Sequence, residues 1–422
     1  MKKLTAVVLG YGARGARYAE YALANPDELE IVAVAEPLRN KCETAMRLYG
    51  IPEDRVFTRW EDLAALPKMA DFAIIGTQDN MHCAPALAMI EKGYDLLLEK
   101  PMAPTAKECK LIAEAAEKKG VRVVVCHVLR FTNFWYGVKE MLDSGMIGDV
   151  RSIIHMENIG NEHFSHSYVR GNWGNTAKSS PMILAKSCHD VDLLQWLLGK
   201  PCLKVQSFGS LEYFTAANRP EGAPDYCLQG CPVGDTCRYN ARKLYYEAPE
   251  THWFRRVAAK SIDFPTDEQV LEAIKDGPYG RCVFACDNDV ADHQVVNMLF
   301  EGGCTASFTV NAFNEGGRHI RLFGTEGEMI GDMDACTMKV YSYNTKEWTE
   351  YHTEQVGHTI ADGHGGGDKG IVRDTVRFFN GESSKSICDV HTSYMNHLIA
   401  FAAEESRLTD QVIDLEQFAE EI

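Results

Sequence analysis

The sequence predicts an α/β domain with a parallel, doubly wound sheet, followed by a second domain. Between residues 4 and 126, short apolar strands alternate with helical patterns, which is typical of parallel strands joined by helices. A glycine-rich turn directly follows the first of these strands. The chain has 422 residues, too many for one ordinary domain, and 45% of them are hydrophobic. We therefore expect two cores and two domains.

Composition excludes several classes of function. The formal net charge is -17, and no cluster of lysine and arginine is present, so we expect no nucleic-acid partner. Residues 1–9 run straight into the glycine turn without an export signal, and no later run approaches about 18 apolar residues. We expect a cytoplasmic protein with no membrane span. The 14 cysteines are then expected as free thiols or metal ligands, because disulfides are rare in that compartment.

The glycine turn predicts a dinucleotide site. The strand at residues 4–9 ends at Gly10, and Gly12 and Gly15 complete a Gly-x-Gly-x-x-Gly pattern that opens a helix reaching residue 24. Gly10 permits the tight turn, Gly12 lets a pyrophosphate approach the backbone, and Gly15 allows the helix to pack closely on the strand. The N–H groups at the start of the helix are free to bind the anion.

An acid after the second strand strengthens this interpretation. Glu36 follows the strand at residues 30–35, at the distance where a carboxylate meets the ribose hydroxyls of the adenosine. A carboxylate there repels a 2'-phosphate, which favours NAD over NADP. Arg14 and Arg39 lie close enough in sequence to soften that preference. Ala13 and Arg14, within the turn, are also expected to contact the cofactor.

The alternation continues to residue 126. Helices are expected at 41–49, 61–66, 83–92 and 107–118, and strands near Val56 and at 71–75, 95–98 and 121–126. In the polar loop after the fourth strand, Thr77, Gln78 and His82 are candidate cofactor contacts, although Asp79 or Asn80 could simply cap the next helix. His127 and Arg130 follow the last strand and point to the same crevice.

Lys100 is the central candidate. The strand at residues 95–98 ends in Glu99-Lys100-Pro101, and ligands of open α/β sheets bind outside the carboxyl ends of the strands. A lysine delivered there is poorly explained as a surface charge. The alternative is an ordinary charged pair before a turn.

Together, the glycines at 10, 12 and 15, Glu36 and Glu99-Lys100-Pro101 resemble the Gfo/Idh/MocA oxidoreductases over essentially the whole chain. The resemblance implies an NAD(P)-binding Rossmann domain at 1–128, with Glu99 and Lys100 at the cofactor. It also implies a substrate and oligomerisation domain at 129–422, of α+β class with an open, mostly antiparallel sheet. Lys100 would then sit beside the nicotinamide and the hydroxyl of a sugar or cyclitol, in a homodimer or homotetramer.

The helical pattern at 181–198 supplies a second group. Lys186, His189 and Asp192 step by three and should lie near one face of that helix. An imidazole there could take the hydroxyl proton as hydride leaves, although a lone histidine is more often a core residue. The resemblance matches His189 to a catalytic histidine. The family's usual aspartate, four residues earlier, is replaced by Ala185, which suggests that Lys186 binds or polarises the substrate; Asp192 is a further substrate candidate.

Two glycine-rich loops carry further substrate candidates. Trp173, in the polar loop at 160–180, could stack on a sugar face or anchor the loop on the core. His364, in the glycine-rich stretch at 363–368, could bond sugar hydroxyls together with Asp368. The alternative there is a plain helix cap by Asp368.

An insertion at about 211–285 carries Cys227, Cys231, Cys237 and Cys282. Thiolates at such spacings could hold a structural zinc tetrahedrally, and free or buried thiols are the alternative. Strands are expected around it at 151–157, 203–208, 295–300, 305–312, 319–323 and 328–331, and helices at 133–142, 369–379 and 394–407.

The function expected from these residues is NAD-linked oxidation of a secondary hydroxyl of a sugar, glycoside or cyclitol, in carbohydrate metabolism. Lys100 polarises the oxygen and His189 takes the proton. A rival uses the same groups, with Lys186 and His364, for an NAD-dependent glycoside hydrolase that oxidises, eliminates, hydrates and reduces in turn. A third hypothesis is an NAD-binding regulator without catalysis.

Overall fold

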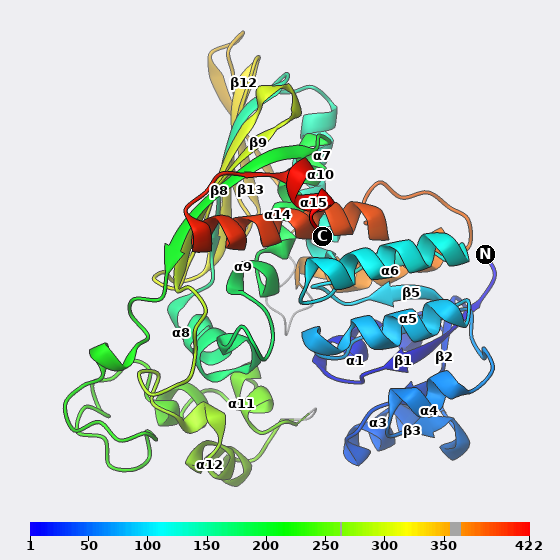
Figure 1. The fold of residues 1–422 in the computed structure, drawn as a ribbon, viewed down its shortest axis with the longest axis vertical. Coiled ribbons are helices and arrows are strands. Elements are labelled where there is room, and N and C mark those ends of the chain that lie inside the picture. Colours follow the sequence, from blue (N-terminus) through cyan, green and yellow to red (C-terminus); the bar gives the residue numbers. More distant parts are fainter. Residues whose placement is uncertain (262–263, 355–363) are drawn as a thin grey trace.

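The computed structural model describes residues 1–261, 264–354 and 364–422, and it contains two sheets (Figure 1). The first sheet has six parallel strands in the order β3-β2-β1-β4-β5-β6. They are β1 (Leu4–Leu9), β2 (Leu29–Ala35), β3 (Val56–Phe57), β4 (Phe72–Ile75), β5 (Asp95–Leu98) and β6 (Val123–Val125). The prediction of a doubly wound parallel sheet is confirmed, and β4 is buried on both faces, as helices on both sides require.

The helices between these strands start and stop where local chemistry dictates. They are α1 (Ala13–Ala19), α2 (Tyr21–Ala24), α3 (Arg39–Tyr49), α4 (Trp60–Ala65), α5 (Cys83–Glu91) and α6 (Ala106–Lys119), with η1 (Glu53–Arg55), η2 (Asp79–Met81) and η3 (Val128–Phe131). Thr105 caps α6 by accepting from the Glu108 N–H, and Gly120 ends it in the left-handed region. The single helix expected up to residue 24 is divided at Glu20.

The second sheet has nine strands in the order β14-β13-β12-β11-β7-β10-β9-β8-β15. They are β7 (Val150–Asn158), β8 (Cys202–Ser210), β9 (His293–Phe300), β10 (Thr305–Asn311), β11 (Gly317–Gly324), β12 (Gly327–Asp332), β13 (Thr337–Ser342), β14 (Glu347–His352) and β15 (Ile413–Asp414). All pairs are antiparallel except β7 with β10. An open, mostly antiparallel sheet is therefore confirmed.

One face of this sheet is covered by helices and the other is open. Along β7, Ile153, His155 and Glu157 are buried, whereas Ile154 and Met156 are exposed. The helices are α7 (Asn133–Asp143), α8 (Asn161–Phe164), α9 (Met182–Ala185), α10 (Cys188–Leu198), α14 (Val390–Thr409) and α15 (Leu415–Glu420), with η4 (Ser165–Arg170), η5 (Asn172–Gly174) and η9 (Glu301–Gly303). Figure 1 shows α14 between the two sheets.

The chain returns to the first sheet near its end. After η10 (His364–Gly366), helix α13 (Gly367–Phe379) packs Ile371, Val376 and Phe379 into the core that contains Val8 and Phe72. The rings of Phe72 and Phe379 lie 5.3 Å apart. Residues far beyond position 128 therefore complete the core of the first domain.

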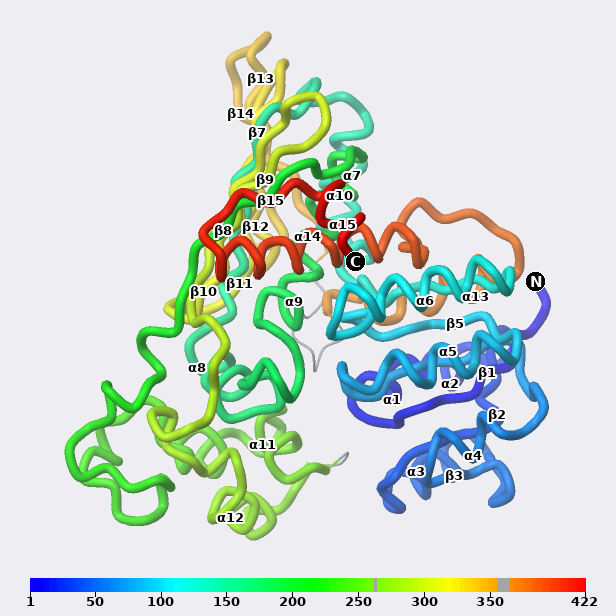
Figure 2. Tube along the Cα trace, in the orientation of Figure 1, coloured from blue at the N-terminus to red at the C-terminus, as the bar shows by residue number. Residues whose placement is uncertain are grey.

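The insertion forms a lobe with a core of its own (Figure 2). It contains η6 (Ala216–Asn218), η7 (Arg242–Tyr246), α11 (Trp253–Ala258), α12 (Asp267–Lys275) and η8 (Pro278–Gly280). Its small core includes Tyr245, Phe254, Val270 and Ile274. Among the helices of the described ranges, none is long and apolar enough to cross a bilayer.

We predict that Phe379→Ala lowers the free energy of unfolding by about 3–5 kcal/mol, because a buried ring leaves a cavity against Phe72. Urea unfolding measures this. Leu408→Ala is the control, since Leu408 is 64% exposed, and should change stability by less than about 0.5 kcal/mol. Equal effects from the two variants would mean that α13 is not part of the core.

Candidate active site

The glycine turn leaves room for a cofactor at one position only. A Cβ on Gly10 would lie 2.7 Å from the Gly76 carbonyl oxygen, and one on Gly15 would lie 2.0 Å from the Gly10 carbonyl oxygen. Both glycines are therefore required by packing. A Cβ on Gly12 would meet nothing within 4 Å, so this residue faces open space at the start of α1. The turn fits the approach of a pyrophosphate.

Glu36 is held rigidly at the end of β2. Its Oε2 accepts from the Tyr11 N–H at 2.9 Å and its Oε1 from the Leu38 N–H at 3.2 Å. Arg39 is directed elsewhere, because it pairs with Glu43 and Glu53. The acid therefore stands beside the glycine turn without an arginine on it in the described part of the chain.

Arg14 joins three distant segments. Its Nε lies 2.7 Å from Glu99 Oε1, its Nη2 2.6 Å from Asp368 Oδ1, and the same nitrogen donates to the Tyr18 hydroxyl at 2.6 Å. Burial would raise the pKa of Glu99, but the charges of Arg14 and Lys100 and the hydrogen bonds from Arg14 and Tyr18 together lower it. Arg14 and Glu99 thus have partners within the protein, which sequence reasoning did not anticipate; their contact with a cofactor stays a prediction.

The loop after β4 is fixed mainly to itself. The Thr77 hydroxyl donates to the Met81 carbonyl at 2.9 Å, and Gln78 is exposed. The His82 ring is buried, with Nδ1 2.7 Å from the Pro101 carbonyl oxygen and Nε2 3.1 Å from that of Thr77. Both ring nitrogens are occupied, so the structure gives His82 a scaffolding position between β4 and Lys100 rather than the predicted contact with the cofactor.

Lys100 meets the second domain at the carboxyl end of β5. Its Nζ donates to the Ala185 carbonyl at 2.8 Å. His189 follows on α10 and is 7% exposed, and its buried Nδ1 has no hydrogen-bond partner among the described residues. Burial lowers the pKa of His189 well below its usual range, and the charge of Lys100 adds to this. A neutral imidazole therefore stands next to an amine.

The expected continuous helix at 181–198 is broken. Helix α9 ends at Ala185 and α10 begins at Cys188, so Lys186, His189 and Asp192 do not share one helical face. At this break the Lys186 Nζ lies 3.0 Å from Glu157 Oε1 on β7. Lys186 lies at the break before α10, whereas His189 and Asp192, three residues apart on α10, both lie beside the His127 ring.

Asp192 and Arg130 form a buried joint. Arg130 donates to both carboxylate oxygens, at 2.8 and 2.6 Å, and Asn396 Nδ2 donates at 2.5 Å. Neither side chain of the ion pair is more than 3% exposed, which gives both a structural role, and their binding of substrate stays a prediction. His127 is also fully buried, 3.0 Å from the Ser393 hydroxyl, with its ring centroid 5.9 Å from that of His189, and its contact with substrate stays a prediction too.

The two loop candidates differ in outcome. Trp173 Nε1 donates to Asp79 Oδ2 at 2.9 Å, and its ring stacks on Tyr168 with centroids 5.9 Å apart. This geometry matches the loop-anchor alternative. His364 Nδ1 lies 3.1 Å from Asp368 Oδ1 and 3.4 Å from Arg14 Nη1. Its imidazole therefore lies beside the Arg14 ion pairs; Gly363 lies outside the described residues.

Comparison with known proteins identifies the family. The model of the oxidoreductase family with an NAD-binding Rossmann fold matches residues 4–127, and the model of its C-terminal alpha/beta domain matches residues 139–415. The chain belongs to the Gfo/Idh/MocA oxidoreductase family. It is thus an enzyme of the dehydrogenase type whose first domain binds a nicotinamide cofactor.

Relatives within the family are distant. The chain is 26% identical over 318 residues to the oxidoreductase YteT of Bacillus subtilis, covering 72% of this chain and 71% of that one. It is 26% identical to an inositol 2-dehydrogenase of Salmonella typhimurium, covering 49% of this chain and 57% of the relative. A solved levoglucosan dehydrogenase, in complex with NADH and levoglucosan, superposes with a TM-score of 0.69 at 17% identity, covering 98% of this chain and 99% of that chain.

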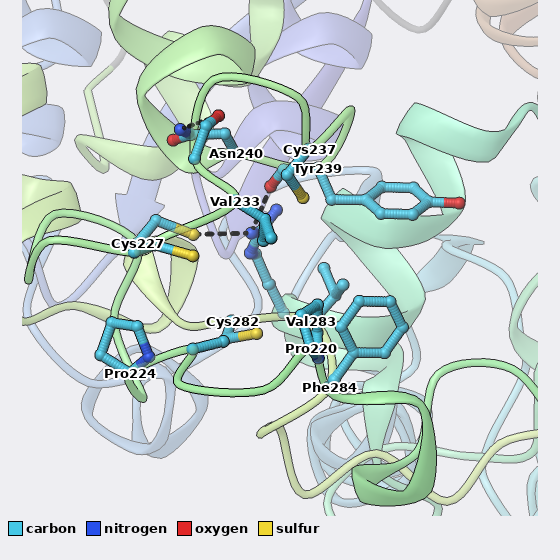
Figure 3. Close-up of a pocket in the computed structure, with 14 residues that line it drawn as sticks. Pro220, Pro224, Cys227, Val233, Cys237, Tyr239, Asn240, Cys282, Val283 and Phe284 are labelled. Atoms are coloured by element: carbon cyan, nitrogen blue, oxygen red, sulfur yellow. Dashed lines mark hydrogen bonds between the residues drawn. The ribbon is translucent and has the colours of Figure 1, made fainter.

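The cysteines of the insertion do not form a compact ligand set. Cys227, Cys231, Cys237 and Cys282 line one small cavity with the guanidinium of Arg170 (Figure 3). Arg170 Nη2 donates to Cys227 Sγ at 3.6 Å. Tetrahedral zinc needs Zn–S bonds of about 2.3 Å, yet no three of these sulfurs lie within 4.8 Å of one another in the described part of the chain. This arrangement gives the zinc prediction no support.

One compact group of possible metal ligands does occur among the described residues: His127, Asp192 and Cys388. Arg130 already neutralises the Asp192 carboxylate at 2.6 Å. A cation there would face the guanidinium, so the group is better explained as part of the buried joint.

We predict that Asp192→Ala costs about 3–5 kcal/mol of unfolding free energy, because it leaves the Arg130 charge buried and unpaired. Asp149→Ala should cost less than about 1 kcal/mol, since Asp149 is 75% exposed beside Arg151. Urea unfolding at neutral pH separates them. Burial would raise the pKa of Asp192, but Arg130 and His127 lower it overall. The contribution is therefore full above about pH 4 and disappears in stronger acid. Matching losses in both variants would contradict a buried joint.

Proposed function

We propose that the protein is an NAD-dependent oxidoreductase that takes hydride from a secondary hydroxyl of a sugar, glycoside or cyclitol. The observation that carries this proposal is the meeting of Lys100 with the second domain. Its Nζ is anchored on the Ala185 carbonyl, 2.8 Å away, at the same sheet edge as the open Gly12. His189 follows four residues after that anchor, in the first turn of α10.

The cofactor would lie along the carboxyl ends of the strands. The residues proposed to hold it are Gly10, Gly12, Ala13, Arg14, Gly15, Glu36, Thr77, Gln78, Glu99 and Lys100. NAD+, when bound, supplies the hydride acceptor. The fixed carboxylate of Glu36 favours the free ribose hydroxyls of NAD over the phosphate of NADP, and Arg14 and Arg39 are both engaged with acids.

The residues of the chain would handle the proton and the oxygen. An ammonium has three N–H donors, and in the described part of the chain the Ala185 carbonyl takes one from Lys100, which leaves two to polarise the substrate oxygen. Burial keeps the pKa of His189 low, and its neutral imidazole can accept the hydroxyl proton. The C–H bond breaks with its electron pair, the O–H bond loses a proton to His189, and the carbon-oxygen double bond forms.

The substrate class rests on the relatives. One is named inositol 2-dehydrogenase and a structural neighbour is levoglucosan dehydrogenase, which are a cyclitol and a sugar enzyme. We propose the same class of small molecule here. We also propose a cytoplasmic homodimer or homotetramer. The open face of the second sheet, where Ile154, Met156 and Ile330 are exposed, supports an oligomer.

A redox-neutral glycoside hydrolase is the second candidate. It is favoured by His364, which lies 175 residues beyond His189 in sequence and whose Nδ1 is 3.4 Å from Arg14 Nη1. Arg14 also pairs with Glu99, the residue before Lys100. Elimination of a glycosidic group and addition of water need acid and base groups beyond those that a hydride transfer uses. Lys186 and His364 would be these groups.

We predict that Lys100→Met lowers kcat for sugar-dependent NADH formation by about 10²- to 10⁴-fold, because the substrate oxygen loses its polarising donor. The affinity for NAD+, measured by fluorescence titration, should change little. Lys118→Met, on the exposed surface of α6, is the control and should keep full activity. An active Lys100→Met enzyme would overturn the proposed function.

p-Nitrophenyl glycosides separate the two candidates. A dehydrogenase should reduce NAD+ stoichiometrically and release no nitrophenol, whereas the hydrolase should release nitrophenol with no net NADH. We expect NADH. If nitrophenol appears instead, His364→Ala should abolish its release while leaving NAD+ binding intact, because the elimination loses its acid or base group.

A further inference from the structure

Glu157 was not among the predicted site residues, yet it binds the amine of Lys186, which was one of them. It lies on β7, facing the helices, and is 2% exposed. Its Oε1 is 3.0 Å from Lys186 Nζ and its Oε2 is 2.6 Å from Arg318 Nε. Arg318 is its direct cross-strand neighbour on β11. Two strands and a helix break therefore converge on one carboxylate.

The surrounding charges leave Lys186 as the group that can reach a ligand. Arg318 is also held by Asp190, at 2.9 Å, and Asp190 is held by His155, at 2.8 Å. Arg318 thus has two acids to neutralise it. In the described part of the chain, Lys186 Nζ has Glu157 as its hydrogen-bonding partner, so two of its three N–H donors are uncommitted.

Lys100 is anchored on the residue that precedes Lys186. The Lys100 ammonium is bonded to the carbonyl of Ala185, and Lys186 is the next residue. The break between α9 and α10 therefore presents one amine fixed by a carbonyl and another fixed by a carboxylate.

We propose that Glu157 is a positioning residue that fixes the Lys186 ammonium, and that Lys186 binds the hydroxyl adjacent to the one oxidised at Lys100. The substrate class that fits is a vicinal diol of a sugar or cyclitol. This inference rests on the proposed function for the role of Lys100. It also explains how Ala185 can replace the family's usual aspartate. The carboxylate is instead that of Glu157 on β7, and it acts through Lys186, so the substrate contacts a cationic donor.

The electrostatics agree with this geometry. Burial lowers the pKa of Lys186, and the Glu157 charge opposes that effect. The charged and titratable groups facing Lys186 are Glu157 on β7, Arg318 on β11, Asp190 on α10, His163 on α8 and His364 on η10. Without the Glu157 charge, burial and the Arg318 charge lose their main opponent, and the pKa of Lys186 falls further.

The positioning role is tested without any substrate. Lys186 is labelled competitively with acetic anhydride across a pH series and quantified by mass spectrometry in the wild type, Glu157→Gln and Glu157→Asp. Glu162→Gln, on the exposed end of α8, is the matched control. Glu157→Gln should lower the pKa of Lys186 by about one unit. This should increase labelling of Lys186 about ten-fold at a fixed pH below that pKa. Glu157→Asp should increase labelling by a smaller amount, and Glu162→Gln should stay near the wild type.

An unchanged labelling profile in Glu157→Gln would overturn the positioning role. NAD+ binding and the melting temperature report whether each variant is folded. If Glu157→Gln does not fold, Glu157→Asp decides: the shorter side chain lengthens the contact and should still shift the profile in the same direction by a smaller amount, and an unshifted profile rejects the proposal.

The diol is tested with myo-inositol and scyllo-inositol and their mono-deoxy analogues, which lack one hydroxyl beside the oxidised carbon. Lys186→Met should raise KM for the diol about ten-fold or more and leave KM for the deoxy analogue unchanged; Lys178→Met, an exposed lysine paired with Asp287, should change neither. Equal losses on both substrates would refute the diol. If no sugar or cyclitol reduces NAD+ in the wild type, the proposed function fails and the diol with it, while the labelling still decides the role of Glu157.

Discussion

The hydrogen bond from the Lys100 ammonium to the Ala185 carbonyl, 2.8 Å long, joins the first sheet to the second domain. It is possible because helix α9 ends at Ala185 and leaves that carbonyl without a helical partner. The segment that carries Lys100 is also fixed from both sides. His82 lies 2.7 Å from the Pro101 carbonyl, and the Met102 N–H donates to His397 at 2.8 Å. Lys100 therefore enters the site from a rigid support.

Buried arginine–carboxylate contacts hold the rest of the site in register. Arg14 connects the glycine turn to Glu99 and Asp368, Arg130 connects the end of β6 to Asp192, and Arg318 connects β11 to Glu157 and Asp190. Such pairs are costly to desolvate, and breaking one leaves a buried charge. They add little net stability, but each specifies one arrangement of segments that lie far apart in sequence.

The first domain was predictable because its signals are local. Buried apolar strands end in polar residues, and the glycine turn, Glu36 and Lys100 fall on one sheet edge. Strand β14 was missed because it is almost wholly solvent-exposed and shows no apolar alternation. Its neighbour in the sheet, β13, was missed as well. The packing of α13 on the first sheet depends on contacts between the two ends of the chain, which no local pattern reports.

The candidate site was predictable only in part. The break at Lys186 coincides with a contact to Glu157 across 29 residues, which periodicity does not report, so the pattern alone gave a continuous helix. Asp192 has the spacing of a site residue, but its partner Arg130 is 62 residues earlier. Glu157 did leave a signal: it occupies an inward position of β7, after Ile153 and His155, where a charge needs a partner.

A crystal structure with NAD+ and a sugar or cyclitol that reduces it tests the account most directly. The account predicts that the oxidised carbinol oxygen lies within hydrogen-bonding reach of both Lys100 Nζ and His189, with the nicotinamide on the Gly12 side and the adjacent hydroxyl on Lys186. A substrate bound elsewhere, with Lys100 still directed only at the Ala185 carbonyl, would contradict it.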